Sequence, residues 1–249
     1  MRVAIKIGYD GSHFNGFAMQ PGKKTVEGEI IKRLKRTSII EGRKEARFQY
    51  AARTDKGVSA FGNVIAFNCK GNAIRVMRGL KNIWLFGYAE VEEKFNPRYC
   101  RTKIYRYYLP AKTIDVQKIK EAAGLFIGEH DFSYFARIDA RNPVRRIDRI
   151  DVIKKEHIIK IDFEAPSFLW NQIRRIVAAL MKYAEGEINI DDIIDALEKR
   201  RRINFGVAPA ENLVLLDVKY DFDFMPLFSE EIIIKREIFM DASTIHRNK

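Results

Sequence analysis

Residues 51–60 read AARTDKGVSA and lie between two stretches in which apolar residues alternate, near 46–51 and 62–68. Alternation with a period of two residues indicates a strand with one buried face, so this segment connects two strands. The Asp-Lys-Gly sequence inside it is typical of a tight turn, because aspartate can bond its own backbone and glycine accepts a positive φ. The segment therefore predicts two consecutive strands with a sharp connection.

Two further strands and two helices surround this pair. Alternating residues predict strands near 2–8 and 83–91. Thr25 can cap a helix whose apolar residues recur at helical spacing, and Asn72 can cap a shorter one. The order predicted for the first half of the chain is strand, helix, strand, strand, helix, strand.

The second half of the chain repeats this order. Strands are predicted near 102–109, 144–153, 157–165 and 213–220, and helices after Asp115, over 173–184 and over 190–197. Two such units predict an α+β fold of two ferredoxin-like (RRM-like) halves that form an extended, mainly antiparallel sheet. With the helices on one face, the other face stays open and suits RNA binding, with a cleft between the halves.

The boundary between the halves is expected where the pattern breaks at Asn96-Pro97-Arg98. We expect residues 1–100 to form an N-terminal half that carries the Asp55 segment. Residues 101–249 are expected to form a C-terminal half that completes the cleft. Residues 225–249 alternate poorly and predict no more than a strand at 232–234.

Composition indicates a globular protein with an anionic partner. Of 249 residues 47% are hydrophobic, and 45 Lys and Arg against 33 Asp and Glu give a net charge of +12. Such an excess of cations favours nucleic acid as the partner. No apolar run approaches the ~20 residues of a membrane-spanning helix, and the lone cysteines and scattered histidines lack metal-ligand spacing. We therefore expect a cytoplasmic protein without a membrane segment or a metal.

Asp55 lies between two cations, Arg53 and Lys56. Burial can raise the pKa of an aspartate by roughly 3–5 units, whereas a close cation lowers it by about 1–3. A half-buried aspartate therefore needs cationic neighbours to act as a nucleophile near neutral pH. On these residues alone two interpretations stay open, a nucleophile and a simple turn.

Four other segments combine turn residues, charge and aromatic side chains, and three basic clusters accompany them. Tyr105 shares a strand face with Tyr107, and this pair could pack a core or present a ring to a base. Arg174 lies near the edge of an apolar helical stripe and could be solvated or reach a carboxylate across the cleft. The clusters that could contact phosphate are Arg141, Arg145, Arg146 and Arg149; residues 199–202; and Lys32, Arg33, Lys35 and Arg36.

Together the segments resemble the tRNA pseudouridine synthase A (TruA) family, from Tyr9 to about Tyr220. The matching pieces are YDGSHFNGF, ARTDKGVSAFGNVIAF, FNPR, YRYYL, GEHDFSYF, FLWNQIRRIVAALM and PAENLVLLDVKY. The resemblance implies that a uridine in the anticodon stem-loop of tRNA is flipped out and isomerised to pseudouridine. It also implies that no metal or organic cofactor takes part, and that the protein is a homodimer.

The motif matches imply a role for each site residue. Asp55 would be the nucleophile, which adds to the sugar C1′ or the base C6 or promotes a glycal route. Tyr105 would stack on the uracil and take part in proton removal at C5, and Arg174 would pair with the nucleophile. Arg53 would help to displace the target base, a step that costs a few kcal/mol. Leu213 would pack near the uracil.

Four positions depart from the family pattern. Lys56 and Ser59 stand where many bacterial members are expected to have alanine and histidine, and Ala18 stands where glutamine is expected. Asn212 replaces an expected glycine, which is tolerated if its backbone is left-handed. These departures bear on the substrate position rather than on the reaction.

Two other functions fit parts of the sequence. A non-catalytic RNA-binding protein accounts for the charge and the fold but not for Asp55, which repels phosphate. A metal-dependent nuclease would use Asp10 and Asp55 as ligands. Metal sites for phosphoryl transfer gather several carboxylates, whereas cations surround this one.

Overall fold

The computed structural model describes residues 1–111, 114–138 and 142–227, and these form two compact units. One unit comprises Met1–Arg101 and the described residues from Val214 onward, and the other comprises the described residues of Thr102–Leu213. The chain thus leaves the first unit close to the predicted boundary and returns to it near the end. The predicted strand at 232–234 and the basic residue Arg141 lie outside the described residues.

The sheet of the first unit is built on β1 (Arg2–Tyr9). This strand pairs antiparallel with β3 (Ser59–Asn68) on one side and with β4 (Ile83–Glu90) on the other. Three strands extend the sheet: β2 (Gln49–Tyr50) antiparallel to β3, β11 (Met225–Pro226) antiparallel to β4, and β10 (Leu213–Lys219) parallel to the start of β3. The pairing of β10 with β3 is what returns the end of the chain to this unit.

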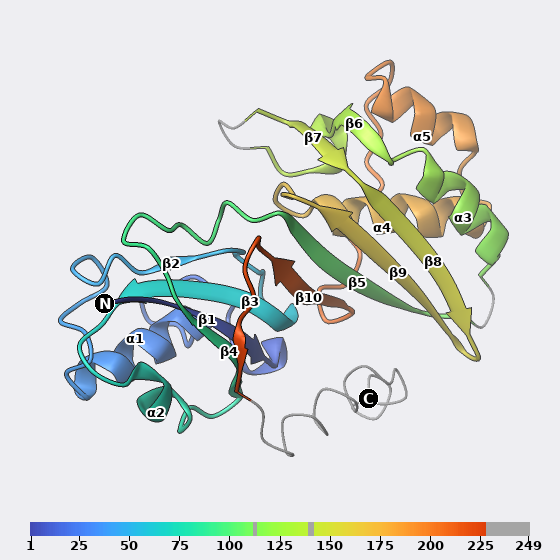
Figure 1. Ribbon diagram of the computed structural model, residues 1–249. Coiled ribbons are helices and arrows are strands. Elements are labelled where there is room, and N and C mark those ends of the chain that lie inside the picture. Colours follow the sequence, from blue (N-terminus) through green and yellow to red (C-terminus); the bar gives the residue numbers. More distant parts are fainter. Residues whose placement is uncertain (112–113, 139–141, 228–249) are drawn as a thin grey trace. The chain divides into compact units, whose positions relative to one another are not determined.

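Two helices, α1 (Val26–Arg36) and α2 (Ala73–Met77), lie on one side of this sheet (Figure 1). The predicted caps are confirmed. Thr25 Oγ1 accepts a hydrogen bond from the backbone N of Gly28 at 3.2 Å, and the Asn72 side chain caps α2 in the same way. Each cap satisfies a backbone donor that the first helical turn leaves unpaired, which contributes about 1 kcal/mol.

The described residues of the second unit form a three-stranded antiparallel sheet, a two-stranded sheet and three α-helices. The three-stranded sheet has the order β5 (Thr102–Pro110), β9 (Ile158–Ala165), β8 (Arg149–Lys155). Every second residue of β9 is buried, as the alternation predicts. The helices are α3 (Val116–Gly124), α4 (Gln172–Ala184) and α5 (Ile190–Leu197), and α3 packs against both α4 and β8.

The prediction of one strand over 144–153 is wrong. The chain forms β7 (Val144–Ile147), which pairs with β6 (Gly128–Asp131) in a separate two-stranded sheet, and then begins β8. The pairing partner changes at Asp148, whose backbone N donates to Glu164 O at 2.8 Å. The buried residues on either side of this change, Ile147 and Ile150, lie three positions apart, so the side-chain alternation shifts by one residue where the partner changes. The described units are thus mixed α and β with mainly antiparallel pairing, and none of the described helices is long and apolar enough to cross a membrane.

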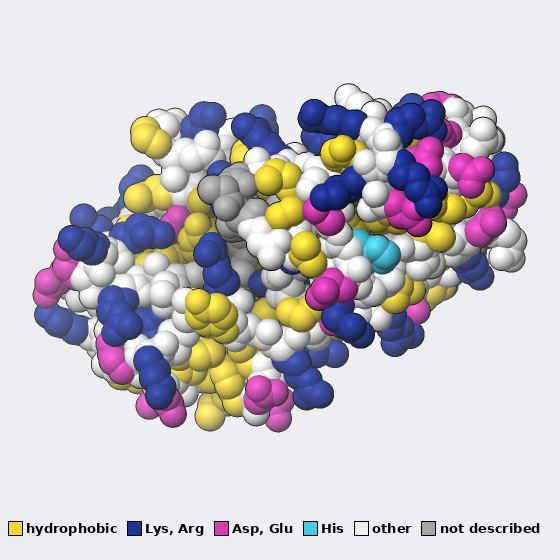
Figure 2. All heavy atoms as spheres, turned by 90° about the horizontal axis from the view of Figure 1, so that it is seen from above, with side chains coloured by type: hydrophobic (Ala, Val, Ile, Leu, Met, Phe, Trp, Pro, Cys, Tyr) yellow, Lys and Arg dark blue, Asp and Glu magenta, His cyan; other side chains and the backbone are white. Residues whose placement is uncertain are grey.

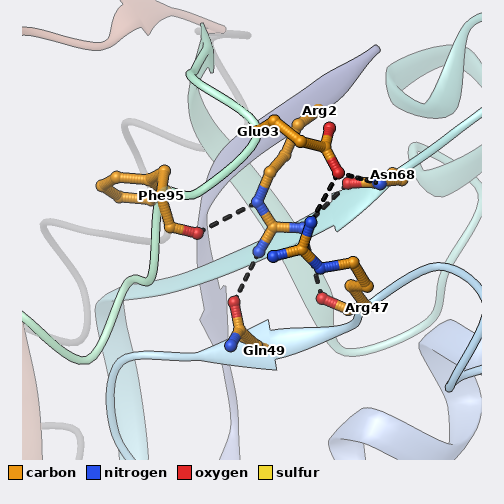
Figure 3. Close-up of polar contacts among 6 residues, drawn as sticks. All are labelled: Arg2, Arg47, Gln49, Asn68, Glu93 and Phe95. Carbon is orange, nitrogen blue, oxygen red and sulfur yellow. Dashed lines mark hydrogen bonds and ion pairs between the residues drawn. The ribbon is translucent and has the colours of Figure 1, made fainter.

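Arg2 is almost completely buried at the start of β1 (Figure 3). Burial lowers the pKa of its guanidinium, because a buried charge loses hydration. The side chain donates to four acceptors: Gln49 Oε1 at 2.6 Å, Asn68 Oδ1 at 2.9 Å, Phe95 O at 3.0 Å and Arg47 O at 3.3 Å. Arg2 therefore ties β1 to β2, to the end of β3 and to the chain that follows β4.

We expect Arg2→Met to lower the free energy of unfolding by about 2–4 kcal/mol, because buried acceptors lose their donor. Urea denaturation followed by circular dichroism measures this change. Arg202→Met, at an exposed position, is the matched control and is expected to stay within about 0.5 kcal/mol of the parent. Equal stability of the two variants would contradict the anchoring role of Arg2.

Candidate active site

Asp55 begins a tight turn just before β3. The backbone N of Val58 donates to Asp55 O at 3.2 Å, and Gly57 has a φ of 89°. A positive φ at the third position of a turn favours glycine. The predicted turn is therefore confirmed, and within it Asp55 is half-buried between the exposed Arg53 and Lys56.

The segment that follows β1 packs directly against this turn. A Cβ on Gly11 would lie 2.3 Å from Val58 O, so only glycine fits there. The backbone N of Gly11 donates to Ser59 Oγ at 3.0 Å, and that of Phe17 donates to Thr54 O at 3.1 Å. The segment YDGSHFNGF and the segment that contains Asp55, both among the matching pieces quoted above, therefore contact each other.

A buried polar network supports the chain before the turn. Tyr9 Oη lies 2.8 Å from Thr54 Oγ1 and accepts a hydrogen bond from Asn63 Nδ2 at 3.2 Å. The Asn63 amide also binds both backbone groups of Ala52, accepting from N at 3.2 Å and donating to O at 2.9 Å. Burial raises the pKa of Tyr9, which keeps its hydroxyl neutral. The chain is thereby held on both sides of Arg53.

Asn63 is a residue that the sequence analysis did not single out, since one asparagine within an apolar strand gives no distinctive signal. We expect Asn63→Leu to lower the free energy of unfolding by about 2–3 kcal/mol, because the N–H and C=O of Ala52 lose their partners in a buried position. Tyr9→Phe removes only one hydroxyl and should cost about 0.5–1.5 kcal/mol. Urea denaturation of both variants tests the network, and a leucine variant as stable as the Tyr9→Phe variant would refute it.

In the second unit, the loop before β10 contacts one of the predicted site residues, Arg174, and ends at another, Leu213. Arg174, in the first turn of α4, donates from Nε to Ala208 O at 2.7 Å, and Ala208 N donates to Arg174 O at 3.1 Å. Leu213 ends the loop, where its backbone N donates to Ala210 O at 3.0 Å and its side chain is buried. A single short loop therefore positions both Arg174 and Leu213.

The strand β5 is attached to the same loop. Tyr107 is fully buried and donates from Oη to Pro209 O at 2.9 Å. Tyr105 lies two residues earlier on the same strand face, and its ring meets that of Phe168 edge to face with centroids 5.4 Å apart. Tyr105, Arg174 and Leu213 thus occupy elements that are all joined by residues 208–213.

Asn171 is a second residue that the sequence analysis missed. It has a φ of 61° at the start of α4, and its Oδ1 accepts from Arg174 Nη1 at 3.2 Å. The backbone of Asn212 is not left-handed, because its φ is not positive. Its carbonyl instead accepts from the backbone N of Tyr108 at 3.0 Å as the chain enters β10.

The five predicted site residues are divided between the units. Arg53 and Asp55 belong to the first, and Tyr105, Arg174 and Leu213 belong to the second. Asp10, considered above as a metal ligand, accepts hydrogen bonds from the N of Ser12 at 3.0 Å and from its Oγ at 2.7 Å. Over the described part of the chain, no three His, Cys, Asp or Glu side chains gather in a way that could hold a metal ion.

The amino-acid sequence of this chain is similar to those of known proteins. A family model described as tRNA pseudouridine synthase matches residues 122–221. A protein of Thermococcus sibiricus named tRNA pseudouridine synthase A is 49% identical over 227 residues, which cover 89% of this chain and 85% of that protein. A protein of the same name from Pyrococcus furiosus is 39% identical over 264 residues, covering 100% of this chain and 97% of that protein.

Solved structures also align with the chain. One of them, of the archaeal box H/ACA sRNP Nop10-Cbf5 complex, matches with a TM-score of 0.36 and 15% identity. The alignment covers 83% of this chain but less than two thirds, 60%, of that chain.

Proposed function

Because this chain belongs to the tRNA pseudouridine synthase family, we propose that it isomerises uridine to pseudouridine in tRNA. The observation that carries the proposal is the identity of 39% to a relative of that name over the whole chain. The reaction exchanges one bond for another. The C1′–N1 bond breaks, the base turns, C5 bonds to C1′, C5 loses its proton and N1 gains one.

We propose Asp55 as the nucleophile of this reaction. Three observations support this role: Asp55 is half-buried, it lies in a turn of defined geometry, and buried contacts hold the chain just before it. A nucleophile held in one orientation avoids the entropic cost of finding it during the reaction. Arg53, exposed two residues earlier, is proposed to contact the RNA backbone and fill the space of the flipped base.

The second unit is proposed to supply the remaining groups. Tyr105 would stack on the uracil and assist proton removal at C5, Leu213 would pack beside the base, and Arg174 would pair with the carboxylate of Asp55. The shared attachment of these residues to the loop 208–213 supports this proposal. A loop bound to both a helix and a strand limits the motion of all three.

We propose further that the chain folds as two ferredoxin-like halves, residues 1–100 and 101–249, with the strand from 213 onward returning to the first. The order β4–β1–β3–β2 in the first unit, with α1 and α2 on one side, supports this assignment. The motif resemblance supports a cytoplasmic homodimer that acts in the anticodon stem-loop without a metal or organic cofactor.

The proposed function is tested with unmodified tRNA that carries tritium at C5 of its uridines. Isomerisation releases this tritium, so the purified protein is expected to release it from one or a few sites, which pseudouridine mapping should place in the anticodon arm. A non-catalytic RNA-binding protein would bind the same tRNA without release. Binding without any release from a set of complete tRNAs would therefore overturn the proposal.

A further inference from the structure

The basic clusters of this protein differ in how far acidic neighbours neutralise them. Residues 187–202 contain five carboxylates and four cations, and basic and acidic side chains intermingle on the part of the molecule that contains α5 (Figure 2). Three of these cations form ion pairs: Lys199 with Asp131 at 2.8 Å, Arg200 with Asp195 at 3.4 Å, and Arg201 with Asp192.

Two cations of the cluster around β7 and β8 also have carboxylate partners. Arg146 pairs with Asp148 at 2.9 Å, and Arg149 pairs with Asp151 at 2.7 Å. A cation that already has a carboxylate partner gains less from a phosphate, because the first partner must be displaced or left unpaired. Five cations of the two clusters in the second unit therefore already have carboxylate partners.

The helices of the first unit are different. Residues 29–36 and 73–81 contain seven cations and one carboxylate, Glu29. Within the described ranges, none of the seven forms an ion pair. We call them the α1–α2 basic surface; they are Lys32, Arg33, Lys35, Arg36, Arg75, Arg78 and Lys81.

Packing brings together the two helices that carry these cations. The apolar residues of α1 are buried, which leaves Lys32, Lys35 and Arg36 exposed. Arg33 joins the two helices, since its Nε donates to Val76 O at 3.1 Å. The exposed cations of α1 and those in and after α2 therefore lie on two helices that contact each other.

The same helix is connected to the candidate site. The backbone N of Glu27, at the start of α1, donates to Phe17 O at 2.9 Å, and Phe17 N donates to Thr54 O beside Asp55. At 1.5 Å per residue, the cations Lys32, Lys35 and Arg36 lie about 7–14 Å along the helix from this contact. An RNA strand spans this distance with a few nucleotides, and both ends of it lie in the first unit.

We propose that the α1–α2 basic surface binds the phosphate backbone of tRNA at nucleotides outside the reacting uridine. This inference rests on the proposed function, since it takes tRNA as the ligand. Lys and Arg that contact phosphate release counterions, so such contacts weaken as salt rises. They carry no base readout, and the surface therefore contributes affinity and orientation rather than the choice of uridine.

Two triple variants with equal charge loss test the proposal. One changes Lys32, Lys35 and Arg36 to Gln, and the control changes Lys199, Arg200 and Arg201 to Gln. Equilibrium binding of unmodified tRNA is measured by filter binding over a range of KCl concentrations. The α1 variant is expected to bind about tenfold or more weakly at low salt, and its slope of log affinity against log salt should fall by about 2–3, as three lost phosphate contacts require.

The control should keep a slope close to that of the parent protein. Equal slopes for the parent and the α1 variant, or equal losses in the two variants, would overturn the proposal. Binding is measured without turnover, so a parent protein that binds tRNA but releases no tritium would refute the proposed function alone. In the tritium assay, the α1 variant is expected to raise KM and leave kcat unchanged, because its changes are remote from the reacting bond.

Discussion

Asp55→Asn is expected to abolish pseudouridine formation, with a fall in the single-turnover rate of about a thousandfold or more, as removal of a catalytic nucleophile does in other enzymes. The amide has nearly the shape of the carboxylate but does not attack carbon as readily. The turn should persist, because it depends on the backbone O of Asp55, which accepts from Val58 N. Tritium release from saturating tRNA measures the rate.

Binding of tRNA should be retained in this variant, because a carboxylate in an electropositive setting is not a phosphate ligand. Asp151→Asn is a matched control at a carboxylate that already pairs with Arg149, and it should keep the parent rate. Appreciable turnover by the Asp55→Asn variant would remove this residue from the role of nucleophile.

Arg174→Met is expected to lower the rate by roughly 10²–10³-fold, which corresponds to about 3–4 kcal/mol, because the proposed carboxylate partner of this half-buried guanidinium is left unpaired. Two effects contribute to this loss. The proposed partner of Asp55 disappears, and the loop at Ala208 loses the donor that binds its carbonyl oxygen at 2.7 Å. Arg174→Lys keeps the charge but not the planar fork, so it should recover only part of the rate.

Two conservative variants separate a role in pairing from a purely structural role. Arg174→Lys retains the positive charge, whereas Arg174→Gln carries no charge but can still donate a hydrogen bond to the carbonyl of Ala208. If the charge matters, the lysine variant should be the faster of the two in the tritium assay. Asn171→Ala, which removes only one contact to Arg174, should keep the parent rate. A glutamine variant as fast as the lysine variant would assign Arg174 to the loop alone.

Local chemistry explains why many elements could be predicted. Thr25 and Asn72 cap helices through bonds to residues three positions away, and β9 buries every second residue along its own length. Such features depend on near neighbours in the chain. The break at Asp148 depends instead on the partner strand, and it was therefore missed.

In the candidate site, too, local features were predictable and contacts with distant residues were not. The turn at Asp55 was predictable because Gly57 follows two residues later, in the position where a turn requires a positive φ. The hydrogen bonds that hold the site residues in place were not predictable. Asn63 binds residues 11 and 54 positions away, and Arg174 binds a carbonyl 34 positions away. No local pattern encodes which distant backbone group a polar side chain will meet.

The sequence by itself determined the helices, most strands, the turn that carries Asp55 and the family resemblance, since all of these are written in residue types at short spacing. Only the tertiary structure decided that Arg2 is a buried anchor and that Gly11 admits no side chain. It also decided that, among the residues the structure describes, the cations of α1 have no acidic partner, whereas three of those after α5 do. The physical reason is that burial and pairing depend on groups that meet only when the chain is folded.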